Sequence, residues 1–140
     1  MTVGIVEWAR RARGAWSWEL TAADALGRHV ASSDDIRARL ELVARARRHA
    51  WRAEQWESVV PVLHDVAVDA TEDVDSGVTR ALAVLAKAHD ADDAVVADAA
   101  LMAAAAAAWR SWCVDAAPVA DLPYLRAAER CLDDAAAQAR

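Results

Sequence analysis

Polar side chains at four positions stand out because they lie on helix faces that are otherwise apolar. When residues 2–29 and 33–60 are projected as α-helices at about 100° per residue, Glu19 is the only charge on the apolar face of the first. Arg47 and Glu54 lie in the middle of the apolar side of the second helix, and His49 lies at its margin. Buried polar groups of this kind are costly unless they are paired or bind a metal ion. These residues are therefore our candidates for a site.

Glu19 and Arg47 are expected to form a buried ion pair. The two helices are joined by a short turn near Ser32, so they should pack antiparallel, with residues equidistant from the turn facing each other. This register brings Glu19 level with residues 45–47. A structural ion pair is our preferred interpretation, and a catalytic or ligand site is the alternative. For His49, we prefer a packing role to that of a metal ligand.

The sequence does not encode a complete di-iron site. In a four-helix bundle such a site takes a Glu from each of two helices and a Glu-x-x-His pair from each of the other two. None of the histidines has a glutamate three residues before it, and Asp98 is placed at the edge of its helix face. We therefore expect no metal cofactor. If iron or manganese is bound, the candidate ligands are Glu19, His49 and Glu54.

Tryptophan and cysteine are the other residues with chemical potential. The tryptophans fall at helical spacings that predict core packing, although Trp16 and Trp51 could instead line an apolar ligand pocket. Cys113 is expected on an inner helix face as an inert thiol, and Cys131 at a more exposed position. No phosphate-binding loop or nucleophile motif is present, so the sequence does not indicate an enzyme.

Five helices must position these residues. They are predicted over about 2–29, 33–60, 77–89, 94–115 and 121–139, with Val62 to Ser76 left unassigned. Ser33 is expected to cap the second helix and Pro61 to end it. Inward-facing residues are predicted on the first helix (Ile5, Trp8, Ala12, Trp16, Leu26) and on the broad apolar side of the second (Ile36, Leu40, Trp51 and, towards its other edge, Leu42, Ala53, Trp56).

The composition predicts an all-α protein. The chain has 140 residues, is rich in alanine, and contains only 4 Gly and 3 Pro. We expect an antiparallel helical bundle that forms a single domain over residues 1–140. The longest uncharged apolar stretch, Ala99 to Trp109, is too short to span a membrane, and no leader or disulfide framework is evident. A cytoplasmic location is therefore expected.

Charge is distributed unevenly along the chain. Residues 1–64 contain ten Arg against eight acids, whereas residues 65–140 contain six bases against fourteen acids. We expect the two halves to pack against each other, within the monomer or across an oligomer. The stripe of Arg45, Arg48 and Arg52 is expected to be a solvated face. RNA binding through it is disfavoured because the formal net charge of -6 repels phosphate at long range.

The stretch Trp16–Leu63 resembles the first helical pair of ferritin-like proteins from actinobacteria. The resemblance is carried by Glu19 and by three short runs, Arg48-His49-Ala50-Trp51, Glu54-Gln55-Trp56 and Pro61-Val62-Leu63. It implies a ferritin-like bundle, here with an additional C-terminal helix. In metal-binding members of that class, inner carboxylates and histidines hold two metal ions that activate oxygen or oxidise iron. Glu19 matches such a ligand position, and His49 and Glu54 are further candidates.

These observations lead to two hypotheses about function. The first is a bundle without a complete di-iron site that has a non-catalytic structural or interaction role. Its partner would be a second copy in a homodimer, or another helical protein. The alternative is a metal- or small-molecule-binding oxidoreductase with an atypical site around Glu19, His49 and Glu54.

Overall fold

The structure is a computed structural model that describes residues 3–61 and 74–140, and in these residues it is entirely α-helical. This confirms the all-α prediction. The five helices are α1 (Ile5–Ser32), α2 (Ile36–Glu57), α3 (Ser76–Ala86), α4 (Ala91–Asp115) and α5 (Leu122–Ala139). None of them has the length and apolar character needed to cross a bilayer. Most of the unassigned stretch Val62 to Ser76 lies outside the described residues.

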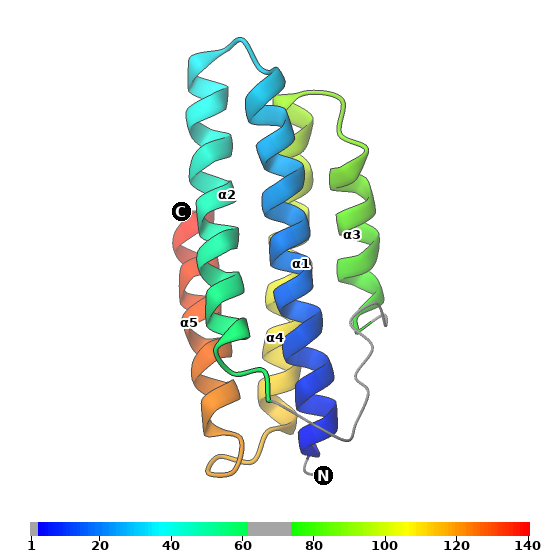
Figure 1. Cartoon of the computed structure of the whole chain (residues 1–140), viewed down its shortest axis with the longest axis vertical. Helices are drawn as coiled ribbons and strands as arrows, with labels where there is room; N and C mark the ends of the chain where they lie inside the picture. The colour runs from blue at the N-terminus through cyan, green and yellow to red at the C-terminus, as the bar shows by residue number, and fades with distance from the viewer. Residues whose placement is uncertain (1–2, 62–73) are drawn as a thin grey trace.

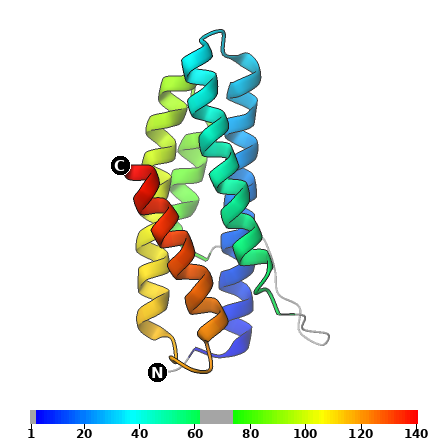
Figure 2. The ribbon, with the colours of Figure 1, turned by 90° about the vertical axis from the view of Figure 1, so that its left-hand side faces the viewer.

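The helices pack into an elongated bundle (Figure 1). α1 and α2 form an antiparallel hairpin, and α4 runs behind α1 with α5 folded back against both α2 and α4 (Figure 2). The shorter α3 packs on α1 and α4 outside this group of four. Gly14 of α1 permits the chain to pass close by before α3, because a Cβ at this position would lie only 2.5 Å from a methyl carbon of Val74.

The helix boundaries match the predictions to within about one turn, with one consequential difference. α1 continues to Ser32, and Asp35 rather than Ser33 caps α2, its side chain accepting a hydrogen bond from the Arg37 N–H at 3.0 Å. The turn is therefore centred near Asp34 rather than Ser32. As a result, the antiparallel register of the hairpin shifts by about one helical turn.

The predicted inner face of α1 is largely confirmed. Trp8, Ala12 and Leu26 are fully buried. Ile5, however, is 57% exposed, and Trp18 rather than Trp16 occupies the core position on the next turns. The predicted inner face of α1 is therefore correct except at its first residue and at Trp16, which is only half-buried against the core.

The predicted orientation of α2 is only partly correct: Leu42, Ala53 and Trp56 are buried as expected, but the other edge of the predicted inner face is exposed. Ile36 and Leu40 are 63% and 64% exposed, and Trp51 is 40% exposed. His49 and Arg52 are buried instead, with only Leu42, Ala53 and Trp56 as buried apolar neighbours on the helix. α2 therefore points part of its charged side inward, because acidic side chains on three other helices meet it there.

A cluster of buried tryptophans fills the bundle near the start of α1 and the end of α4. We call it the tryptophan layer; its members are Trp8, Trp18, Trp56, Trp109 and Trp112. The Trp56 ring lies 6.0 Å from that of Trp109 and 5.8 Å from that of Trp112, and Trp8 stacks on Tyr124 at 4.7 Å. These large rings fill the core of a chain that has no Phe.

Candidate functional site

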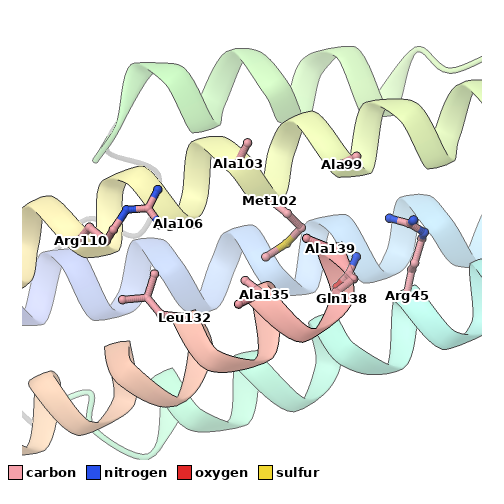
Figure 3. A pocket seen from close by; sticks show the side chains of 11 residues that line it. Arg45, Ala99, Met102, Ala103, Ala106, Arg110, Leu132, Ala135, Gln138 and Ala139 are labelled. Atoms are coloured by element: carbon pink, nitrogen blue, oxygen red, sulfur yellow. The ribbon is translucent and has the colours of Figure 1, made fainter.

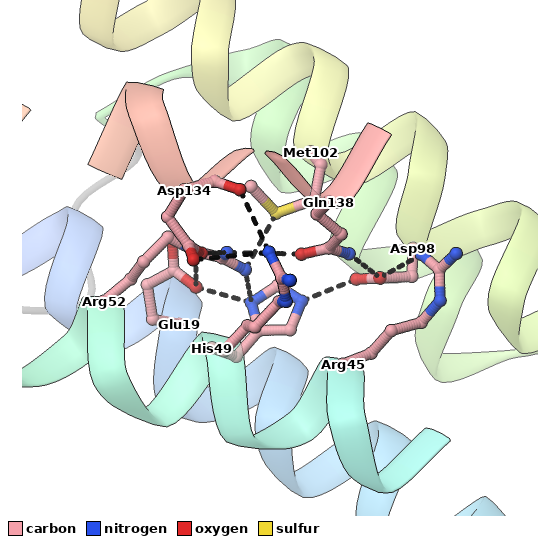
Figure 4. A network of polar contacts seen from close by, with 9 residues as sticks. Glu19, Arg45, His49, Arg52, Asp98, Met102, Asp134 and Gln138 are labelled. Carbon is pink, nitrogen blue, oxygen red and sulfur yellow. Dashed lines mark hydrogen bonds and ion pairs between the residues drawn. The ribbon is translucent and has the colours of Figure 1, made fainter. Parts of the chain in front are cut away.

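A network of charged side chains crosses the middle of the bundle (Figure 4). We call it the polar layer. Its members are Glu19 on α1, Arg45, Arg48, His49 and Arg52 on α2, Asp98 and Met102 on α4, and Asp134 and Gln138 on α5. Four helices thus contribute to one site. α2 supplies all its cations, and the other three helices supply the carboxylates.

His49 lies between two buried carboxylates. Its Nδ1 is 2.5 Å from Glu19 Oε2, and its Nε2 is 2.5 Å from Asp98 Oδ1. A neutral imidazole has only one N–H, so both bonds can form to ionised carboxylates only when His49 is a doubly protonated cation. Burial lowers the pKa of His49, but the hydrogen bonds and charges of Asp98 and Glu19 outweigh that effect and raise it. His49 therefore acts as a buried cation in this layer.

The side chain of Arg52 is fully buried and contacts polar-layer residues on α1, α4 and α5. Its Nε donates to both carboxylate oxygens of Glu19, at 3.1 and 3.2 Å. Nη1 donates to Asp134 and, at 3.3 Å, to the side-chain carbonyl of Gln138. Nη2 lies 3.1 Å from the sulfur of Met102. A guanidinium suits this position because its fork of donors can serve several acceptors at once.

Asp98 anchors the other end of the layer. Its Oδ2 accepts hydrogen bonds from Arg45 Nη1 at 2.8 Å and from Gln138 Nε2 at 3.0 Å, while Oδ1 faces His49. Burial raises the pKa of this carboxyl, yet its hydrogen bonds and charge interactions with His49 and Arg45 lower it overall. Asp98 is fully buried, so its predicted place at the edge of the helix face is wrong.

The buried charges of the layer balance. Apart from Arg48, whose side chain is 39% exposed, three acids, Glu19, Asp98 and Asp134, face three cations, Arg45, His49 and Arg52. This balance also confirms that the basic and acidic halves of the sequence pack against each other within the monomer. Each carboxylate keeps at least one cation, which offsets the cost of removing it from water.

The sequence placed Glu19 correctly but assigned it the wrong partner. Glu19 is buried and 2% exposed, as predicted. The predicted pair with Arg47 is wrong, because Arg47 lies on the exposed side of α2 while Glu19 bonds to His49 and Arg52. The shifted turn explains this error, since moving the register by one turn replaces residues 45–47 opposite Glu19 with residues 49–52.

The other candidate residues do not gather around Glu19 as a set. His49 does, but as a charged partner rather than a simple packing residue. Glu54 is exposed on the outside of α2, and Trp16 and Trp51 lie away from the polar layer's contacts. Within residues 3–61 and 74–140, no group of three or more His, Cys, Asp or Glu side chains is arranged to hold a metal ion.

Sequence reasoning missed Arg52, Asp98 and Asp134. The expectation that Arg45, Arg48 and Arg52 form a solvated face is wrong for Arg52, which is fully buried. A usable signal was present, since Arg45, His49 and Arg52 recur at helical spacings of four and three and so share one face. Without knowledge of the facing acids, that face was indistinguishable from a surface stripe.

The thiols lie apart from any catalytic arrangement. Cys131 is fully buried, which contradicts the more exposed position expected for it, and burial raises its pKa well above the ordinary range. Cys113 is half-buried, and its pKa is also raised, mainly by burial. A raised pKa keeps a thiol protonated and unreactive at neutral pH.

A pocket of about 440 Å³ opens beside the polar layer, between α4 and α5 (Figure 3). It is lined largely by alanines, with Arg45 and Gln138 of the polar layer towards one end, Arg110 at the other and Met102 between them. Neither Trp16 nor Trp51 lines it. The possible role of those two residues as ligand-pocket aromatics therefore gains no support from this pocket.

Comparison with known proteins returned no similar protein: no family model, curated protein or solved structure matches the chain.

Proposed function

We propose that this chain is a ferritin-like helical bundle with a non-catalytic, protein-interaction role. In this proposal the polar layer occupies the level at which metal-binding members of that class hold their ions. The observation that carries the proposal is His49, which uses both ring nitrogens on carboxylates of the protein itself.

The donor set of the polar layer does not suit a di-metal site. Each oxygen of Glu19 and Asp98 already accepts from a cation or an amide of the protein, and both ring nitrogens of His49 face carboxylates, so a metal ion would have to displace these partners. A guanidinium about 3 Å from Glu19 would also repel a metal cation. The layer is therefore better suited to fixing the register of four helices than to holding iron or manganese.

With the interior occupied in this way, we assign function to the surface. Three large apolar side chains of α2 are exposed, and removing such groups from water favours association. The partner is a helical surface, either a second copy of this chain or another helical protein. Neither a membrane nor a nucleic acid is part of the proposal.

Metal content tests the proposal directly. The protein is purified without chelator, its iron and manganese are quantified, and each Fe²⁺ or Mn²⁺ titration is followed by calorimetry. We expect far less than one metal ion per chain. The same titrations on Glu19→Gln and Glu54→Gln serve as matched controls, one inside the bundle and one outside.

The alternative is a metal-binding oxidoreductase using Glu19, His49 and Glu54, and it makes the opposite forecast. Stoichiometric iron or manganese that is lost in Glu19→Gln would overturn our proposal in its favour. If Glu54→Gln also abolished binding, α2 would have to rotate to bring that exposed carboxylate inward.

A further inference from the structure

The outward side of α2 carries a continuous stripe that no described helix covers. We call it the outer stripe; it consists of Ile36, Leu40, Val43, Arg47, Ala50, Trp51 and Glu54. Most of its members are spaced by three or four residues, which keeps them on one side of the helix. Val43 is half-buried and the others are exposed.

This exposure follows from the polar layer. α2 turns His49 and Arg52 inward to meet acids of α1, α4 and α5, so the apolar residues on its opposite side must face outward. Ile36 and Leu40 each expose more than three-fifths of their surface, and Trp51 exposes 40%. An exposed tryptophan is a common anchor in protein interfaces.

Two opposite charges within the outer stripe define what can cover it. Arg47 precedes Trp51 by four residues and Glu54 follows it by three, and neither side chain has a hydrogen bond or ion pair with any described residue. They lie two helical turns apart, about 10 Å along the axis. A partner surface must therefore present an acid and a base with the same separation and the opposite direction.

A second copy of α2 has that pattern when it runs antiparallel. We propose that two copies of this chain pair through the Arg47–Glu54 part of their outer stripes, about a two-fold axis between Ala50 and Trp51. Arg47 of each copy then lies opposite Glu54 of the other, and each Trp51 packs on the small Ala50 of the other. The inference rests on the proposed interaction role and names its partner.

The parallel arrangement is disfavoured by the same residues. It would place Arg47 beside a second Arg47 and Glu54 beside a second Glu54, and like charges at such distances repel. The antiparallel arrangement is also isologous, so the contact closes at two copies instead of growing into a filament. Burial of Trp51 against Ala50 supplies the apolar contribution to this dimer, and the charges select its direction.

Charge reversal and its rescue provide the test. Sedimentation velocity is measured on the full chain at concentrations from about 1 to about 100 μM. It should show a monomer–dimer equilibrium whose Kd lies within that concentration range. Arg47→Glu and Glu54→Arg should each raise Kd at least tenfold, and the double variant R47E/E54R should return it close to the starting value. Both side chains are exposed and unpaired, so circular dichroism should show each variant folded.

Matched variants elsewhere make the test specific. Trp51→Ala should raise Kd at least tenfold, whereas Val96→Ala, on the exposed side of α4, should leave it unchanged. Ala50→Cys, in a Cys113→Ser background, should form an interchain disulfide near the two-fold axis.

Two results would overturn the inference. One is a chain that stays monomeric at every concentration, and the other is a dimer whose Kd ignores Arg47→Glu and Trp51→Ala. Both results would still allow another helical protein to bind the outer stripe. The proposed function itself fails separately, through stoichiometric metal in the same samples.

Discussion

The polar layer and the tryptophan layer are neighbours built on the same helices, but they differ in whether their buried polar atoms have partners. In the polar layer, each side-chain nitrogen or oxygen that is buried has a partner. In the tryptophan layer, the indole N–H groups of Trp8, Trp56 and Trp109 are buried and have no partner among the described residues. Hydrogen bonds and ion pairs hold the polar layer together, whereas close packing of large rings holds the tryptophan layer together.

The difference teaches where specificity and stability come from in this bundle. Large rings can stack in several geometries at similar energy, so they stabilise the bundle without fixing its register. The polar layer tolerates only the alignment that gives His49 and Arg52 their acids, because any other leaves a buried charge unpaired. We therefore expect the two layers to respond differently to the same kinds of change.

Removing Glu19 should have the largest effect. Glu19→Ala leaves His49 and Arg52 with excess buried positive charge, and breaking such a network typically costs about 3–5 kcal/mol of unfolding free energy. Chemical denaturation followed by circular dichroism measures this. Glu54→Ala, at the exposed glutamate, should change the free energy by less than about 0.5 kcal/mol. Equal effects of the two variants would show that Glu19 is not part of a buried network.

Raising the pH should lower the free energy of unfolding by less than Glu19→Ala does, because the carboxylates of the polar layer keep their guanidinium partners. Despite burial, Asp98 and Glu19 raise the pKa of His49 in the folded state above its ordinary value of about 6.5. The stabilisation from the His49 proton is therefore complete below about pH 6.5 and is lost as pH rises through the folded pKa. In acid the opposite holds for Asp98, whose lowered pKa makes its contribution disappear only as pH falls through that value.

Denaturation midpoints from about pH 6 to about pH 9 check this expectation. The wild-type midpoint should decline across that range, and the decline should be absent in His49→Gln but retained in His89→Gln, where the imidazole is exposed. An identical slope in all three proteins would mean that folding does not raise the pKa of His49.

The smallest effect is expected for a conservative change in the tryptophan layer. Trp109→Phe removes an indole N–H that has no partner, so the loss is limited to packing and should amount to about 1–2 kcal/mol. Should Trp109→Phe destabilise as much as Glu19→Ala, the contrast between the layers would be wrong.

Much of the fold could be predicted from the sequence because the helices have clear boundaries. Alanine content, the scarcity of Gly and Pro, and Pro61 were sufficient to place five helices, and the lone charge on the apolar face of α1 identified Glu19. What could not be predicted was the rotation of α2. Its two sides hold apolar residues and basic residues, and only the acids of other helices decide which side is inside.

The same limit applies to the site. Asp98 and Asp134 are separated from Glu19 by 79 and 115 positions in the chain, so no local pattern links them. Their pairing with Arg45 and Arg52 depends on how α4 and α5 pack against α2. A short-range error also mattered, since misplacing one turn by a few residues was enough to assign Arg47 instead of His49 and Arg52.

The even balance of three acids and three bases has a consequence for how this protein can evolve. A single substitution at any of these positions strands a charge inside the bundle, so drift at one position must be accompanied by a compensating change on another helix. Lineages descended from this chain should therefore replace these positions in pairs, for instance Arg52 together with Asp134, while the neighbouring tryptophans vary one at a time.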